Sequence, residues 1–433
     1  MRFLLLFLSI LFIYFNADAT TIEELKRENE LLKLRLQLLE KQVNKLLNQS
    51  KDNKRVNIPQ VKAKKNSNIN GKFYGFIRVD MAYDSSRTLN GNSYYYILER
   101  DKERFILTPR STRFGYKFYK QAYGNFPAID GKIEMDFFGG GNEDKAQLRL
   151  RHAYLKLNYK NYSWLIGQTW DLFSSLNPYV ADFGTLYYAG NLGFRIAQLR
   201  YTRNYKLSER VSTDFGIAFA RPYRDNTDLD IDGIDDGEHS GMPDIQLRFG
   251  YKRKYSKNRV ATLAISGVMG KDKLSTPING EDEFEVSGIC IEQTFKFNER
   301  FSFKGEYYEG KNIMSYAGAV GYGVNTRYGD RIYGFGGWGQ LFYKLPSGNL
   351  WTVGYGMDAN KLDQLKTYQD RFRHKNMRWF TNYTIKLRKD VKMILDISRM
   401  FTEYYDANST NGLLLNREKF DNWRTQINFI WFF

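Results

Sequence analysis

Hydrophobic and polar residues alternate along most of this chain, from residue 71 to residue 433. Ile77 and Val79, for example, fall on one face of an extended strand, whereas Arg78 and Asp80 fall on the other. A period of two is typical of strands with one apolar and one polar face. Soluble β-sandwiches also alternate, but their strands are usually shorter than these. The pattern predicts an all-β architecture for this region.

We count sixteen candidate strands. They lie near residues 72–84, 104–119, 129–138, 146–159, 162–172, 192–204, 209–221, 243–255, 258–271, 283–297, 299–310, 330–344, 348–358, 376–388, 390–404 and 419–433. About 23 residues per strand and connection suit a tilted membrane strand of roughly ten residues with short turns and longer outer loops. We therefore expect a sixteen-stranded antiparallel transmembrane barrel of the porin type. Fourteen or eighteen strands are the alternatives, because the parity of 146–159 is ambiguous.

The last candidate strand has the clearest pattern. Trp423, Trp431 and Phe433 fall on one face, with Arg424 and Gln426 opposite. Such a strand is typical of an outer-membrane barrel, and a closing Phe resembles the signal that the outer-membrane insertion machinery reads. We expect Phe433 to be this assembly signal; a soluble protein that ends in Phe by chance is the alternative.

A period of seven precedes the strands, within residues 20–47. It predicts a coiled-coil helix, because apolar residues that recur every 3.5 positions form a seam between helices. The seam positions are Ile22, Leu25, Asn29, Leu32, Leu36, Leu39, Val43 and Leu46. The helix predicts oligomerisation without fixing its stoichiometry; a helix folded back on its own chain is the alternative. Residues 48–70 are polar and basic, and we expect them to be a linker.

Composition supports export to a membrane that strands cross. Mean hydropathy is −0.56, and no apolar run after residue 20 reaches the roughly 18 residues of a spanning helix. Arg2, an apolar core over 3–15 and the small residues at 17–19 predict a signal peptide over 1–19; an uncleaved anchor is the alternative. The single cysteine, Cys290, supports neither a lipid anchor nor a disulfide. We expect the barrel, 71–433, in the outer membrane of a Gram-negative bacterium, with the helix in the periplasm.

The formal net charge is +17. Because an exported chain rarely meets nucleic acid, lipopolysaccharide, other outer-membrane lipids or anionic solutes are better partners. Alternation assigns most of the basic side chains to the barrel lumen, where they would concentrate anions; the alternative is that facing charges neutralise one another and stiffen the wall. The charged side chains predicted to line the pore are Arg78, Arg110, Arg113, Arg149, Arg151, Arg195, Arg200, Glu134 and Asp136.

Four motifs carry a family resemblance. Thr-Pro-Arg-Ser-Thr-Arg-Phe-Gly (108–115), Gly-Lys-Ile-Glu-Met-Asp-Phe-Phe-Gly-Gly (131–140), Leu-Arg-Leu-Arg-His-Ala-Tyr (148–154) and Gly-Gln-Thr-Trp (167–170) resemble the DcaP-like porins. The likeness is clearest from about 105 to 200 and includes the signal-then-coiled-coil layout.

This resemblance implies a homotrimeric sixteen-stranded barrel that takes up small organic anions such as dicarboxylates without energy input. It also implies that Arg110, Arg113, Arg149 and Arg151 are pore residues. The phosphate-selective porins are a related possibility.

Two loops have distinct chemistry. Segment 174–191 is aromatic and carries Asp182; it is expected either to fold inward as a constriction or to pack against a neighbouring subunit. Asp228, Asp230 and Asp232 have the spacing of a Ca²⁺ loop. The twelfth position is His239 rather than Glu, so a solvated acidic loop is the alternative. We expect no other cofactor.

Catalytic chemistry is not expected. The three histidines, His152, His239 and His374, lie in no recognisable catalytic setting. The remaining rival to a porin is an adhesin or structural barrel without an open channel.

Overall fold

The computed structural model describes residues 69–433, with gaps at 90, 141–144 and 223–234, and the single residues Glu30, Lys33, Gln37 and Lys41. The chain divides into two units, Met1–Asn66 and Ser67–Phe433. The predicted signal peptide, the heptad seam, the linker up to residue 68 and the three aspartates of the acidic loop lie outside the described residues and stay predictions. No helix within the described part of the chain is long and apolar enough to cross a membrane.

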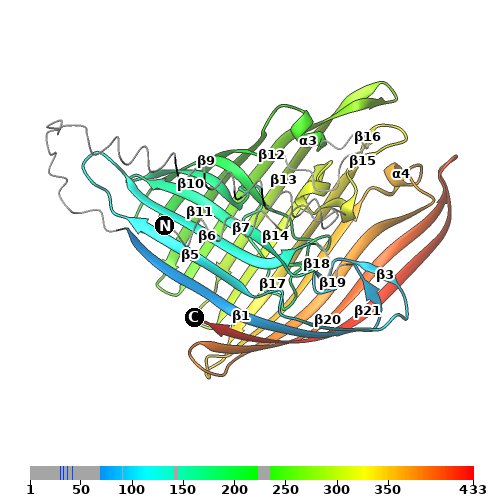
Figure 1. Ribbon diagram of the computed structural model, residues 1–433. Coiled ribbons are helices and arrows are strands. Elements are labelled where there is room, and N and C mark those ends of the chain that lie inside the picture. The colour runs from blue at the N-terminus through cyan, green and yellow to red at the C-terminus, as the bar shows by residue number, and fades with distance from the viewer. Residues whose placement is uncertain are drawn as a thin grey trace. The chain divides into compact units, whose positions relative to one another are not determined.

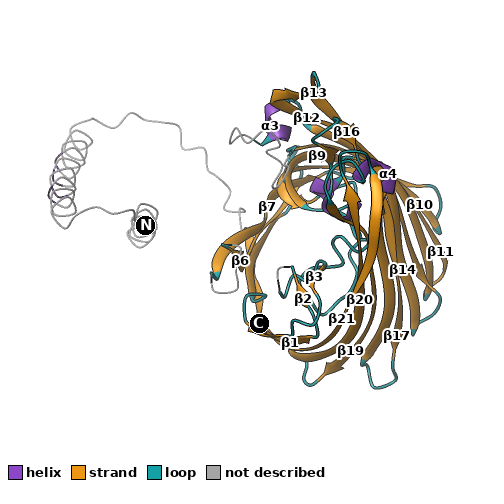
Figure 2. Ribbon diagram, turned by 90° about the vertical axis from the view of Figure 1, so that its right-hand side faces the viewer, coloured by secondary structure: helices purple, strands orange, loops and turns teal. Residues whose placement is uncertain are grey.

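Sixteen antiparallel strands of the described residues form a closed barrel, which confirms the predicted fold class (Figures 1 and 2). The strands in chain order are β1 (Asn70–Asp84), β4 (Arg104–Thr108) with β5 (Arg113–Lys120), β6 (Ala128–Gly139), β7 (Gln147–Asn158), β8 (Tyr162–Trp170), β9 (Arg195–Lys206), β10 (Val211–Ala220), β11 (Asp244–Ser256), β12 (Arg259–Ile278), β13 (Glu281–Lys296), β14 (Phe301–Lys311), β17 (Tyr333–Lys344), β18 (Leu350–Asn360), β19 (Arg371–Lys386), β20 (Val391–Asn408) and β21 (Leu413–Phe432). β4 and β5 both pair with β1 and make one interrupted strand. Residues 424–432 of β21 pair with β1 and close the barrel, which leaves no open edge in the described sheet for lipid to meet.

The two faces of the wall differ in chemistry. On β21, Trp423 and Trp431 are about half exposed, at 48% and 49%, whereas Arg424 and Asn428 are fully buried inside the barrel. Apolar side chains therefore face the lipid, and polar side chains fill the interior, as in outer-membrane barrels.

A β-bulge in β7 explains the ambiguous parity of this strand. Glu134 pairs with His152, but the next residue, Met135, pairs with Leu150, so that Arg151 is the extra residue. Both Arg151 and His152 are consequently buried on the inside. Because a bulge shifts the alternation by one, no single period describes the strand.

Connections are short at one end of the barrel and long at the other. The long connections contain the short elements β2 (Arg87–Thr88), β3 (Ile97–Glu99), α3 (Asp236–His239), η1 (Met314–Tyr316), η2 (Ala319–Gly321), β15 (Val324–Asn325), β16 (Asp330–Arg331) and α4 (Leu362–Leu365). In Figure 2, β2 and β3 lie inside the ring of strands. Segment 171–194, between β8 and β9, also enters the lumen. Of the two paths expected for this loop, inward folding or packing against a neighbouring subunit, the structure shows the first.

Candidate functional site: an arginine-lined cavity beside an inward loop

The inward loop, residues 171–194, is held against the inner wall by side chains from strands far along the chain. The Leu172 N–H donates to the Gln246 Oε1 at 2.7 Å, and the Tyr179 N–H to the Gln340 Oε1 at 2.8 Å. The Asn376 amide donates to the Tyr188 carbonyl at 2.8 Å. The loop therefore runs across the inner faces of β11, β17 and β19 and narrows the lumen on that side.

Carboxylates of the wall bind the start of the same loop. Glu292 accepts the N–H groups of Ser175 and Leu176 at 2.5 and 2.8 Å. Glu306 accepts the Ser174 hydroxyl at 2.7 Å. These three hydrogen bonds to two carboxyl groups of the wall therefore anchor this end of the loop.

Glycines of the wall and of the loop allow the far end of the loop to lie against the wall. A Cβ at Gly356 would lie 2.2 Å from the Ala189 carbonyl oxygen, and one at Gly190 would lie 2.1 Å from the Gly337 carbonyl oxygen. Gly190 also has a φ of +110°, which favours glycine. The backbone of the loop lies directly against the backbone of β17 and β18, and only glycine permits so close an approach.

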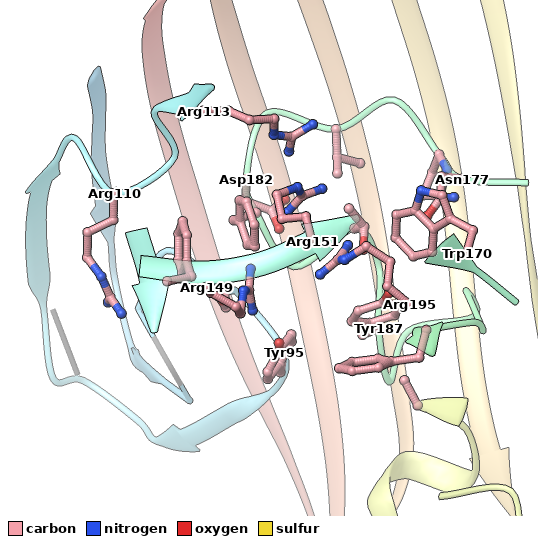
Figure 3. Close-up of a pocket in the computed structure, with 18 of the residues that line it drawn as sticks. Tyr95, Arg110, Arg113, Arg149, Arg151, Trp170, Asn177, Asp182, Tyr187 and Arg195 are labelled. Atoms are coloured by element: carbon pink, nitrogen blue, oxygen red, sulfur yellow. The ribbon is translucent and has the colours of Figure 1, made fainter. Parts of the chain in front are cut away.

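A cavity of about 1080 Å³ lies between the inward loop and the opposite wall (Figure 3). Among the described residues, nine basic side chains and two carboxylates line it. They are Arg78, Arg110, Arg113, Lys132, Arg149, Arg151, Arg195, Arg373 and Lys392, with Glu134 and Asp182. The lining is therefore strongly positive.

Glu134 and Asp136 hold together a basic cluster, which consists of Arg113, Lys132, Arg149 and Arg151. Asp136 accepts two hydrogen bonds from Arg149, at 3.1 and 2.9 Å, and one from Arg151 at 2.6 Å. Glu134 accepts a hydrogen bond from Arg151 at 2.9 Å and lies 3.4 Å from the Arg113 and Lys132 nitrogens. Four cations thus share two carboxylates, so the cluster is held rigid and still keeps an excess of positive charge.

Arg195 is bound differently. Its guanidinium carbon lies 4.6 Å from the centre of the Trp170 ring and 5.9 Å from that of Phe194, and among the described residues no carboxylate pairs with it. Aromatic faces orient a cation without cancelling its charge. Arg195 therefore presents its full charge to the cavity.

Tyr187 and Tyr95 are two of the inner-loop tyrosines that line the cavity, and burial keeps their phenols neutral. It raises the pKa of the Tyr187 phenol above its ordinary value of 10.0, although the nearby Arg195 opposes the shift. Burial likewise raises the pKa of Tyr95, against the effect of Arg149. Neither phenol adds negative charge to the cavity at neutral pH.

The structure brings together most of the predicted pore residues. Arg78, Arg110, Arg113, Arg149, Arg151, Arg195 and Glu134 all line the cavity. Asp136 is fully buried behind Arg149 and Arg151. Arg200 is not among the lining residues; it donates to the Trp170 carbonyl at 2.5 Å and to Gln198 at 2.8 Å.

Other lining residues were missed by sequence reasoning. Arg373 and Lys392 belong to strands whose charges were not assigned to the lumen. Tyr95, Tyr96 and Tyr188 come from loops, where alternation carries no information.

The described residues contain no group of three or more His, Cys, Asp or Glu side chains able to hold a metal ion. The predicted Ca²⁺ ligands lie outside this part of the chain, so that site stays a prediction.

The comparisons with known proteins agree with the barrel. The sequence matches the DcaP outer membrane protein family over residues 17–309. The crystal structure of the outer membrane channel DcaP of Acinetobacter baumannii is 22% identical, with a TM-score of 0.66, and the match covers 84% of this chain and 97% of that one. None of the curated proteins matches this chain.

Two further solved structures share the fold. The anion-selective porin from Comamonas acidovorans is 11% identical, with a TM-score of 0.54, over 84% of this chain and all of that one. The in-vitro folded trimer form of OmpT of Vibrio cholerae is 12% identical, with a TM-score of 0.50, over 84% of this chain and 99% of that one.

Proposed function

Because the chain belongs to the DcaP outer membrane protein family and forms a barrel of the bacterial outer membrane, we propose that it is an anion-preferring diffusion porin. Its solutes are small organic anions such as dicarboxylates, which cross the barrel passively. We do not assign it an enzymatic activity. Lipopolysaccharide, other outer-membrane lipids and the insertion machinery that reads Phe433 are its further expected partners.

The observation that carries this proposal is the imbalance of charge in the cavity, where nine basic side chains meet two carboxylates among the described residues. Positive charge in a narrow space with low-dielectric walls raises the local concentration of anions. Guanidinium groups also bind carboxylates through paired hydrogen bonds. A solute with two carboxylates can contact two arginines of this wall at once.

We also propose that the porin is a homotrimer. The heptad of residues 20–47 supports self-association, since a hydrophobic seam needs a partner helix. A structural neighbour, OmpT of Vibrio cholerae, was solved in a trimer form.

Uptake into proteoliposomes tests the proposed function. We expect succinate to enter several-fold faster than putrescine, a four-carbon dication of similar size, because the cavity attracts anions and repels cations. Liposomes without protein give the background rate. Equal or faster putrescine entry would contradict anion preference. If neither solute enters above background and bilayers carry no current, the barrel is a closed adhesin or structural protein instead.

A further inference from the structure

The inward loop carries its own negative charge beside the cavity. Segment 171–194 contains two carboxylates, Asp171 and Asp182, and no basic residue. Of the two, Asp182 lines the cavity. The neighbouring Phe183 ring lies 5.2 Å from the Arg149 guanidinium carbon and 5.5 Å from that of Arg151. A bare carboxylate at this position would face the basic cluster and oppose its effect on anions.

Arg378 of β19 cancels this charge from behind the loop. Its Nη1 lies 2.6 Å from the Asp182 Oδ2, and both side chains are fully buried. The Asp182 Oδ1 accepts the Gly184 N–H at 2.7 Å, which holds the carboxylate in place. Arg378 itself is not among the cavity-lining residues. The cavity wall therefore holds a carboxylate whose charge is balanced by a cation, and not a bare aspartate.

The surroundings of Arg378 keep it in this position. The Tyr94 ring lies 4.5 Å from its guanidinium carbon, and the Phe380 ring 5.7 Å. A second carboxylate, Asp396, lies 4.0 Å from the Nη2. Because water is excluded here, opposite charges act strongly on each other, and a single unpaired charge would be costly.

We propose that Arg378 is a specificity-determining residue of the pore, which masks the charge of the inward loop without touching the solute. This inference rests on the proposed function, since it explains how the anion preference is kept. The basic cluster attracts anions, and Arg378 neutralises the Asp182 carboxylate, which would otherwise weaken that attraction.

A double-mutant cycle in planar bilayers tests the proposal. In Arg378→Gln, the unpaired Asp182 lowers the chloride-to-potassium permeability ratio by about two- to five-fold, because it adds one negative charge to the wall of a confined lumen. In Asp182→Asn/Arg378→Gln, the carboxylate that Arg378 masks is also absent, and the ratio returns close to that of the wild type. Asp182→Asn alone removes the loop carboxylate and leaves Arg378 beside Asp396, so the ratio stays the same or rises.

The outcomes separate a charge effect from a structural one. An unchanged ratio in Arg378→Gln, or a double variant as low as the single variant, would overturn the proposal. A fall in the ratio of Asp182→Asn would also contradict the masking, and this variant keeps Arg378, so it does not depend on the assembly of Arg378→Gln. If the wild type prefers cations, the proposed function fails, but the dependence of the Arg378→Gln shift on Asp182 still tests the masking.

Discussion

At the scale of single residues, the cavity arginines differ in how their charge is compensated. Arg149 and Arg151 share Asp136, so removing either cation also disturbs a buried carboxylate. Arg195 packs on Trp170 instead, and its loss leaves no carboxylate without a partner among the described residues. Arg195 is therefore the cleanest position at which to remove one positive charge from the cavity.

We predict that Arg195→Gln lowers the chloride-to-potassium permeability ratio by about two- to five-fold, because one unscreened charge is lost from a confined lumen. The zero-current potential across a bilayer in a salt gradient measures this ratio. Arg203→Gln is the matched control, since Arg203 is an exposed residue of the same strand and does not line the cavity. Equal shifts in the two variants would show that net charge, and not the cavity, sets the preference.

Sequence reasoning found the cavity residues on β1, β5, β6 and β9 because alternation alone assigns an inward side there. It did not single out Arg378, although Arg378 also lies in a predicted strand. The importance of this residue depends on its pairing with Asp182, which a distant loop brings into the lumen. Such a pairing has no signal in a single sequence, since nothing local links the two positions.

At the scale of elements, the strands were predictable, but two features of the wall were not. All sixteen strands follow from the alternation, and their bounds differ from those predicted by a few residues at most ends. The break between β4 and β5 and the bulge at Arg151 interrupt the period, so the pattern could not define them. The inward path of segment 171–194 depends on contacts with β11 to β21, which only the closed barrel brings within reach.

We predict that Gly356→Ala displaces the inward loop, because the added Cβ would lie 2.2 Å from the Ala189 carbonyl oxygen. When the loop can no longer lie against Gly356, it moves further into the cavity or out of it. Single-channel conductance then changes by about a factor of two or more, since pore width limits current. Gly267→Ala is the control: its Cβ would lie 3.5 Å from the nearest heavy atom, an ordinary contact. Wild-type conductance in Gly356→Ala would show that these glycines do not position the loop.

At the scale of the whole molecule, self-association is predicted to depend on the heptad. Leu32→Asp places a charge in the seam and forfeits about 1.5–3 kcal/mol of apolar burial per helix. We expect the proposed trimer to dissociate at a lower temperature in detergent, as measured by its native mass. Lys41→Asp, outside the seam, is the control. A trimer of unchanged stability in Leu32→Asp would show that the barrels associate without the helix.

The sign of the charge in the lumen is the central claim for the molecule as a whole, because the closed wall, the inward loop and the basic cluster act together to produce it. The zero-current potential of wild-type protein in a planar bilayer, with a KCl gradient across it, tests this claim most directly. We predict a potential displaced toward the chloride equilibrium value. A potential displaced toward the potassium value would contradict it.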